Sequence, residues 1–355
     1  MRPPTTSTAI ANHIRQKIQT GEYPHNSVMP TEIELSTTFG AARNTIRKAI
    51  DSLVHEGLIQ KHQGRQSRVH NPLQKQIKGT NDLAWFTYLR PEHMASNQIY
   101  FDLFMLMVER ARSYGLGVQF LNPTAISDWQ GMHWNSTRWA GFFAVGLSKS
   151  SIGEEVLQHL QELPHLISID EDDDTPGFYT VTTDNFNSAR IATAHLLERG
   201  CRHIAFLNTN IQQNLSFRER QRGFEYEHKK AFGSCVHPKI ITLETQGKNY
   251  FECCKLFEGF IQNIGDIDGI FCASDTIAIQ LMAAAQRYGV IIPEKLKIIG
   301  YDGVFAGQHV SPRLSTVAQP LKKIIDVALS LALQPDHSTP QTIKIPGRLI
   351  LGETT

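Results

Sequence analysis

The chain has 355 residues, of which 41% are hydrophobic and 19% charged, a composition typical of a globular protein with two or three domains. It contains no run of 18 apolar residues and its first eight residues are polar, so neither a membrane-spanning helix nor a secretion signal is expected. The spacing of the five cysteines matches neither a zinc site nor a disulfide framework, which favours reduced thiols in the cytoplasm.

The net charge of +1 is unevenly distributed along the chain. Residues 1–80 carry eleven lysines and arginines against five acidic residues, a net charge of +6 (11 − 5). The remainder carries 24 basic and 29 acidic residues, a net charge of −5 (24 − 29). A basic N-terminal part joined to an acidic body indicates that the N-terminal part binds a polyanion.

The first seventy residues contain the pattern of three short helices. Ile10, Ile14 and Ile18 recur every four residues, which gives a helix one apolar face. Thr31 and Glu34 have the spacing of a capping box, which marks the start of a second helix. Together with glycines at the expected ends, these signals predict helices over 7–20, 31–39 and 42–56.

The third predicted helix has the surface chemistry of a DNA-reading helix. Its buried stripe is Ile46, Ala49, Ile50 and Leu53, and arginine and asparagine side chains lie outside that stripe. These two residue types read guanine and adenine in the major groove, and two helices joined by a tight turn form a helix-turn-helix. A hairpin over 58–69 would add a wing. The residues expected at DNA are Thr31, Arg43, Asn44, Thr45, Arg47, Lys48, Lys61, Gly64, Arg65 and Arg68.

The segment from Ala9 to Val69 resembles the GntR-type winged helix. The matching pieces are 29–32 (MPTE), 39–49 (FGAARNTIRKA) and 56–59 (EGLI). The chain departs from that family at Ala42, where a capping serine is usual, and at Gln66, where a second wing glycine is usual. The resemblance implies double-stranded operator DNA as a partner. A DNA-binding domain over 1–71 and a linker over 72–80 are expected.

From residue 81 onward, apolar strand patterns alternate with helical patterns, which predicts parallel sheets covered by helices. About 275 residues are too many for one small sheet, so two lobes are expected. The predicted fold class is therefore α/β, with an N-terminal winged helix-turn-helix followed by a two-lobed, doubly wound parallel α/β sensor domain over 81–355.

Six motifs in this region resemble the sensor domain of the LacI/GalR family. They are 181–185 (VTTDN), 194–206 (AHLLERGCRHIAF), 220–224 (RQRGF), 270–275 (IFCASD), 298–302 (IIGYD) and 314–320 (LSTVAQP). The resemblance implies the fold of type I periplasmic binding proteins and a homodimer. It places about 81–183 and 305–334 in lobe one, and about 184–304 and 335–355 in lobe two. The two parts together resemble the arabinose-repressor type of bacterial regulator.

Ligands of open α/β sheets bind beyond the carboxyl ends of the strands. Asp170, Ser274 and Asp302 follow predicted strands, and Arg220 is expected to begin the helix after 203–207. An arginine facing carboxylates can satisfy the donors and acceptors of a polyhydroxylated ligand, and the resemblance implies that all four residues contact it.

Other polar and aromatic residues of this domain have weaker assignments. The candidates for stacking on a sugar ring are Tyr250, Trp134 and Tyr88. Asp184 and Asp275 are expected mainly as N-caps of the helices that follow them.

The sequence contains none of the motifs Gly-x-Ser-x-Gly, Gly-Lys-Ser/Thr or His-Glu-x-x-His, so an enzyme is not expected, nor a metal or another cofactor. The favoured function is a cytoplasmic repressor of carbohydrate-use genes, which a sugar releases from a pseudo-palindromic operator. Two alternatives stay open. One is a regulator that responds to a non-sugar ligand such as a nucleoside, and the other is a constitutive DNA binder with a lapsed sensor.

Overall fold

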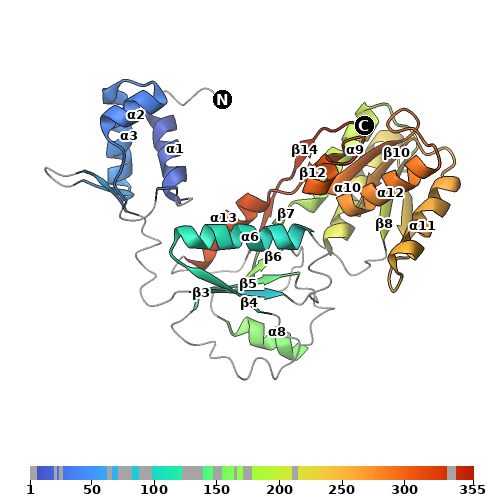
Figure 1. Cartoon of the computed structure of the whole chain (residues 1–355), viewed down its shortest axis with the longest axis horizontal. Helices are drawn as coiled ribbons and strands as arrows, with labels where there is room; N and C mark the ends of the chain where they lie inside the picture. Colours follow the sequence, from blue (N-terminus) through green and yellow to red (C-terminus); the bar gives the residue numbers. More distant parts are fainter. Residues whose placement is uncertain are drawn as a thin grey trace.

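The computed structural model describes residues 6–19, 22–23, 27–61, 66–70, 82–87, 98–121, 139–146, 154–163, 166–170, 178–209, 215–333 and 341–355. They form a small helical head followed by two lobes, each built on a six-stranded sheet (Figure 1). No helix within these ranges is long and apolar enough to cross a membrane.

The head consists of α1 (Ser7–Gln19), α2 (Glu32–Phe39) and α3 (Arg43–His55), with a hairpin of β1 (Ile59–Gln60) and β2 (Arg68–Val69). The predicted apolar residues of α1 and α3 are buried in one core. The capping box of Thr31 and Glu34 is present, and Gly40 ends α2 with a φ of 59°, which glycine adopts without steric cost. Ala42 is the N-cap of α3 and makes no side-chain capping bond.

The first lobe contains β3 (Asp82–Thr87), α6 (Gln98–Ser113), β4 (Gly117–Leu121), β5 (Trp139–Val145), α8 (Glu154–Gln161), β6 (Leu166–Ile169) and β7 (Tyr179–Thr183). These strands join β13 (Thr342–Ile345) in a parallel sheet of order β13-β7-β6-β5-β3-β4. Strands β3 and β7 are buried on both faces, as expected for strands of a parallel sheet.

The second lobe contains α9 (Asn185–Glu198), β8 (Ile204–Thr209), α10 (Leu215–Phe232), β9 (Lys239–Leu243), α11 (Tyr250–Gln262), β10 (Gly269–Cys272), α12 (Asp275–Arg287), β11 (Lys297–Asp302), a 3₁₀ turn η1 (Phe305–Gln308), β12 (Ser315–Ala318) and β14 (Arg348–Ile350). Its sheet order is β14-β12-β11-β10-β8-β9, with only the edge strand β14 antiparallel. Helix α13 (Leu321–Ala332) packs in the core of the first lobe.

The chain crosses between the two sheets at 183–185, 318–321 and 345–348. The expected assignment of 305–334 to lobe one is wrong for β12, which pairs with β11 in the second sheet. The expected assignment of 335–355 to lobe two is wrong for β13, which pairs with β7 in the first sheet. Both strands have only four residues, too few for their periodicity to indicate a sheet. The outer bounds of the domains stay predictions.

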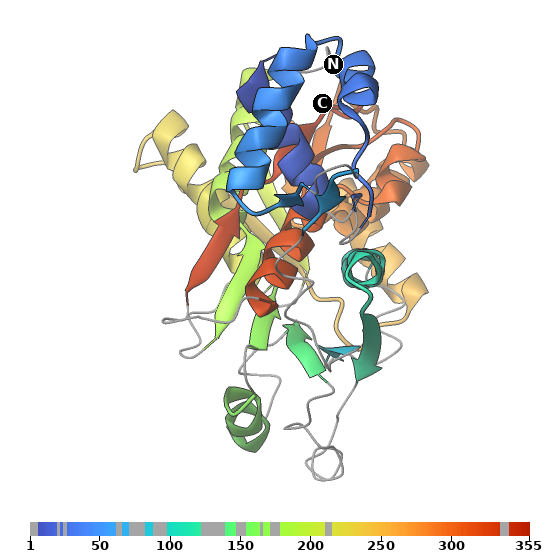
Figure 2. The same ribbon diagram turned by 90° about the vertical axis from the view of Figure 1, so that its left-hand side faces the viewer.

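Figures 1 and 2 both place the head above α6 and α13 of the first lobe. The segment 71–81 that leads from the head to β3, including the predicted linker, lies outside the described residues.

Candidate effector site and DNA-reading face

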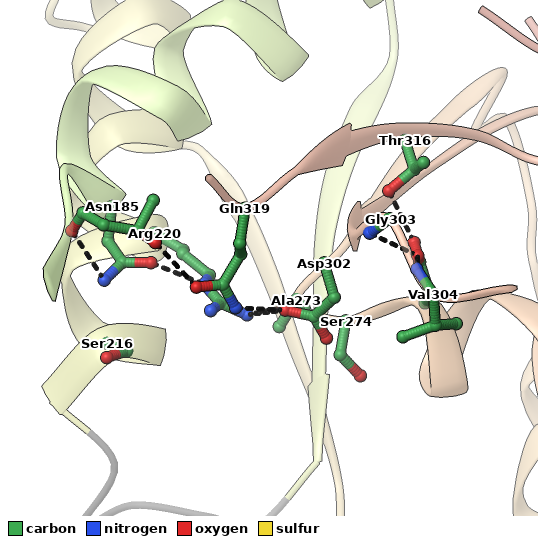
Figure 3. A network of polar contacts seen from close by, with 12 residues as sticks. Asn185, Ser216, Arg220, Ala273, Ser274, Asp302, Gly303, Val304, Thr316 and Gln319 are labelled. Carbon is green, nitrogen blue, oxygen red and sulfur yellow. Dashed lines mark hydrogen bonds and ion pairs between the residues drawn. The ribbon is translucent and has the colours of Figure 1, made fainter. Parts of the chain in front are cut away.

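Arg220 is the centre of a buried polar network at the carboxyl ends of β10 and β11 (Figure 3). Only 2% of its surface is exposed. Its Nε donates to Asn185 Oδ1 at 3.0 Å and its Nη1 to the Ala273 carbonyl at 2.7 Å. The same Nη1 lies 3.2 Å from Asp302 Oδ1, and the guanidinium stacks over the Tyr301 ring at 3.8 Å. A buried charge held by this many partners has a fixed position.

The prediction that Arg220 begins its helix is wrong, because α10 starts at Leu215 and Arg220 lies on its second turn. The polar residues between 210 and 219 weaken the helical pattern there, so the sequence places the start too late.

Asp302 ends β11 in a conformation that side chains other than glycine rarely adopt, with a φ of 120°. Its Oδ1 accepts a hydrogen bond from Gln319 Nε2 at 2.8 Å, and its carbonyl accepts one from the Gln319 amide at 3.1 Å. Burial raises the pKa of Asp302, while Arg220 and Gln319 act in the opposite direction. Such backbone strain persists only where the surroundings enforce it, and it is concentrated at functional sites.

Ser274, predicted as a ligand contact, is the N-cap of α12 and accepts the Ile277 N–H at 3.3 Å. The prediction of an N-cap role for Asp275 is therefore wrong, whereas Asp184 does cap α9. A hydroxyl that accepts one hydrogen bond can still donate another, so the Ser274 assignment stays a prediction.

Asp275 is fully buried and braces the loop after β11. Its Oδ1 accepts from Thr316 Oγ1 at 2.6 Å, and its Oδ2 accepts from the amides of Gly303 at 2.7 Å and Val304 at 2.8 Å. Burial raises the pKa of Asp275 to about 8, and the Asp302 carboxylate acts in the same direction. Asp275 thus holds the turn that positions Asp302.

Asp170 approaches this network from the first lobe. It follows β6 with a φ of 66°, and its carbonyl accepts a hydrogen bond from Ser216 Oγ of α10 at 3.3 Å. Burial is the main cause that raises the pKa of Tyr301, and the carboxylates of Asp302 and Asp170 add to it. The structure therefore brings Asp170, Arg220 and Asp302 to one place between the lobes.

Tyr250 is 67% exposed at the start of α11, where its ring packs on Phe251. The contacts of Arg220 come instead from α9 and from the ends of β10 and β11. The role of Tyr250 stays a prediction, and Tyr88 and Trp134 lie outside the described residues.

Sequence reasoning missed four residues that hold the predicted ones in place. They are Thr183, Asn185, Tyr301 and Gln319. All four lie within the LacI-like motifs, which was the available signal. The motifs gave no indication that residues more than a hundred positions apart bond to one another.

The predicted DNA-reading residues that the structure describes belong to the start of α2, to α3 and to the hairpin of the head. Arg43, Asn44, Lys48 and Arg68 are exposed, and Thr45 is half-buried. The Thr31 side chain caps α2. Lys61 forms an ion pair with Asp51. Gly64 and Arg65 lie outside the described residues.

Arg47 is exposed and paired, a feature that sequence reasoning did not foresee. Its Nη2 and Nε reach the two carboxylate oxygens of Glu32 at 2.8 and 3.2 Å. The Arg47 hydrogen bonds lower the pKa of Glu32. A bidentate pair of this kind fixes the plane of a guanidinium. The arginine predicted to read bases is thus paired with the first residue of α2 in this structure.

Two family models match the chain. Residues 6–69 match the bacterial regulatory proteins of the gntR family, and residues 193–355 match the periplasmic binding protein-like domain. The chain therefore carries an N-terminal segment similar to the gntR regulators and a C-terminal segment similar to the periplasmic binding protein-like domain.

Several relatives are named as repressors of sugar operons or sugar metabolism. The arabinose metabolism transcriptional repressor of Halalkalibacterium halodurans is 26% identical over 332 residues, which cover 88% of this chain and 84% of that protein. The ribose operon repressor of the same organism is 32% identical over 180 residues, 49% of this chain and 52% of that protein. The chain spans about half the length of the ribose operon repressor and of several other relatives.

Solved structures show the same fold. The transcriptional regulator CelR in complex with cellobiose has a TM-score of 0.66 at 16% identity, covering 92% of this chain and all (100%) of that one. A LacI family regulator from Enterococcus faecium with bound ribose has a TM-score of 0.62 at 20% identity, covering 78% of this chain and 98% of that one.

Proposed function

We propose that the chain is a bacterial transcription repressor whose head binds operator DNA and whose two lobes bind a sugar that releases it. The observation that carries the proposal is the buried Arg220–Asp302 pair, placed where α/β sheets bind ligands. Asp170 of the other lobe bonds to α10, the helix that carries Arg220. Because its DNA partner lies in the bacterial cytoplasm, we expect the repressor to act there.

The chemistry of the pair suits a polyhydroxylated ligand. The Arg220 guanidinium donates only, the Asp302 carboxylate accepts, and a hydroxyl group does both. A sugar hydroxyl can therefore bridge the guanidinium and the carboxylate. It would replace hydrogen bonds that these two groups make with protein atoms in this structure. Relatives named for arabinose, ribose and sucrose operons, and neighbours solved with cellobiose and ribose, support this class of ligand.

A homodimer is part of the proposal. Phe101 and Met105 lie one turn apart on α6 and are 52% and 47% exposed, and Phe120 on the edge strand β4 is 42% exposed. Phe104 of α6 packs against Phe120 of β4, with their ring centroids 5.5 Å apart. An exposed apolar face next to a sheet edge is a natural surface for a second copy, and two copies would present two heads to a pseudo-palindromic operator.

The test separates the two activities by mutation. An operator is selected from random duplex DNA with the wild-type chain, and L-arabinose, D-ribose, sucrose and cellobiose are titrated by calorimetry. We expect Arg220→Lys, which keeps the charge but loses the planar fork, to weaken sugar binding at least tenfold, about 1.4 kcal/mol, with operator binding unchanged. Arg47→Ala should do the reverse, with an operator loss of about 1–3 kcal/mol.

Wild-type sugar affinity in Arg220→Lys would contradict the site assignment. Wild-type operator affinity in Arg47→Ala would contradict the DNA-reading face. Binding of a nucleoside but none of the four sugars would replace the ligand class while keeping the repressor.

A further inference from the structure

Gln319 joins the effector carboxylate to the other lobe through one side chain. It lies between β12 and α13, at the second crossing of the chain, and is 8% exposed. Its Oε1 accepts a hydrogen bond from Thr183 Oγ1 at 2.6 Å, and its Nε2 donates to Asp302 Oδ1 at 2.8 Å. Figure 3 shows Gln319 reaching toward Asp302.

The two partners of Gln319 belong to different sheets. Thr183 is the last residue of β7 and pairs in register with Ile345 of the first sheet. Asp302 is the last residue of β11 and pairs in register with Ala318 of the second sheet. The amide group therefore spans the two lobes at the point where the chain passes between them.

Helix α13 continues directly from this residue and is firmly attached to the first lobe. Ile324 and Ile325 are buried in the first-lobe core, and Asp326 forms an ion pair with Arg110 of α6 at 2.7 Å. A displacement of Gln319 is thus transmitted to a helix that moves with lobe one.

The first turn of α13 also lies between two cavities. Lys322 and Lys323 line a cavity of about 410 Å³ that Asp302 and Gln319 share. The same two lysines line a groove of about 900 Å³ whose opposite wall is α1 of the head, including His13 and Lys17. The turn after Gln319 therefore contacts the surroundings of the effector carboxylate on one side and faces the DNA-binding head on the other.

We propose that Gln319 is a positioning residue that couples occupancy of Asp302 to the arrangement of the lobes. The inference rests on the proposed function. Asp302 Oδ1 forms an ion pair with Arg220 and accepts a hydrogen bond from Gln319. A ligand hydroxyl that bonds to this oxygen therefore competes with the Gln319 amide. A buried amide does not stay unpaired, so Gln319 must move to find a new partner when a ligand occupies Asp302. That movement weakens its hydrogen bond with Thr183. The ligand thereby acquires different contacts in two lobe arrangements, as any allosteric effector must.

The first arm of the test needs no ligand. Thr183→Val removes only the first-lobe end of the bridge, and hydrogen–deuterium exchange is read at the amides of Gly303 and Val304. Thr183 does not bond to those amides, which Asp275 holds. We expect Thr183→Val to raise their exchange severalfold, and to add nothing further in a Gln319→Leu background. Thr193→Val is the matched control, because its hydroxyl bonds to Ala189 within α9.

Unchanged exchange at these amides in Thr183→Val would overturn the coupling. If Thr183→Val raised the exchange of these amides equally in the wild-type and Gln319→Leu backgrounds, the coupling would be overturned too, because the effect would not depend on Gln319.

The second arm uses whichever of L-arabinose, D-ribose, sucrose and cellobiose binds the wild type. In Thr183→Val, sugar-dependent release from the selected operator should fall by about tenfold more than sugar affinity does, within the usual range of allosteric coupling. A merely structural role would change affinity and release together, and normal release would overturn the proposal. If no sugar binds the wild type, the proposed ligand class fails, and the exchange arm still decides the role of Gln319.

Discussion

Asp275 combines complete burial, three hydrogen bonds and a second carboxylate nearby, which has a consequence for the dependence of stability on pH. Its pKa is raised from an ordinary value of 3.8 to about 8 by burial first and by Asp302 second. Between these two pH values the native state holds a proton that the unfolded state has lost. The free energy of unfolding therefore falls as pH rises through this window and levels off above it.

We predict that Asp275→Asn flattens this dependence. An asparagine carbonyl can accept the Gly303 and Val304 amides, and its NH₂ group can donate to Thr316, so the contacts are kept without the charge. Thermal unfolding at several pH values should show the melting temperature of the wild type falling from about pH 5 to pH 8, and that of the variant falling less. Asp184→Asn, at an N-cap where asparagine is equally good, is the control. Parallel curves for wild type and Asp275→Asn would contradict the prediction.

The sequence was sufficient to predict the chemically distinctive residues of the candidate site and insufficient to predict the residues that bond to them. Arg220, Asp302 and Asp170 stand at the ends of recognisable strands or in recognisable motifs, and the structure brings them together. Gln319 and Thr183 are common residue types whose importance arises from a contact across 136 positions. Asp275 was misjudged because the residue before it, Ser274, is also a good cap, and local sequence does not decide between them.

Helix α3 begins without a side-chain cap, which leaves a defined opportunity for stabilisation. Ala42 has a φ of −60° and a ψ of 144°, the extended conformation in which a serine can cap the helix. We predict that Ala42→Ser stabilises the head by about 0.5–2 kcal/mol. Calorimetric unfolding of the full chain would measure this in the head transition. Ala42→Val, which cannot cap, serves as the control, and equal effects of the two substitutions would exclude a capping role.

Helices α9 and α10 approach each other closely at Gly223. A Cβ at this position would lie 2.3 Å from the Phe186 carbonyl oxygen and 2.8 Å from Ala189 Cβ. We predict that Gly223→Ala lowers the stability of the second lobe by about 1–3 kcal/mol, because the two helices must separate.

A matched control for Gly223 exists in α11. Gly259 is also helical, and nothing lies within 4 Å of its Cβ position. Gly259→Ala should therefore stabilise, by about 0.4–1 kcal/mol. Urea denaturation of both variants measures the difference, and destabilisation of similar size at both glycines would contradict the steric explanation.

Most of the elements could be predicted from the sequence, since their apolar patterns span several turns or a complete buried strand. The exceptions share a physical cause. Strands β12, β13 and β14 have four, four and three residues, and each is defined by its partner in the sheet rather than by its own pattern. Those partners determine which lobe each strand joins, so the second and third crossings of the chain could not be placed correctly.

At the scale of the whole molecule, the proposed dimer depends on the exposed apolar face of α6 and β4. We predict that Phe101→Glu combined with Met105→Glu gives a monomer in sedimentation velocity and weakens operator binding, because the two heads no longer act as one unit. Val236→Glu changes an equally exposed apolar residue in the loop before β9 and is the control. A dimer that persists in the double variant would place the interface elsewhere.

The three chain crossings lie side by side, which determines how the molecule can move. The Asp184 amide bonds to the Ile345 carbonyl, Gly347 bonds to Ser188, and Thr183 bonds to Gln319. All three crossings leave from one edge of each sheet, the edge formed by β13 and β7 in the first and by β14 and β12 in the second. Such an attachment has the form of a hinge, so we expect the lobes to turn about the line of crossings rather than slide apart. Strand β4, at the opposite edge of its sheet, then travels farthest, so a small turn at the candidate site is amplified at the face proposed to hold the second copy.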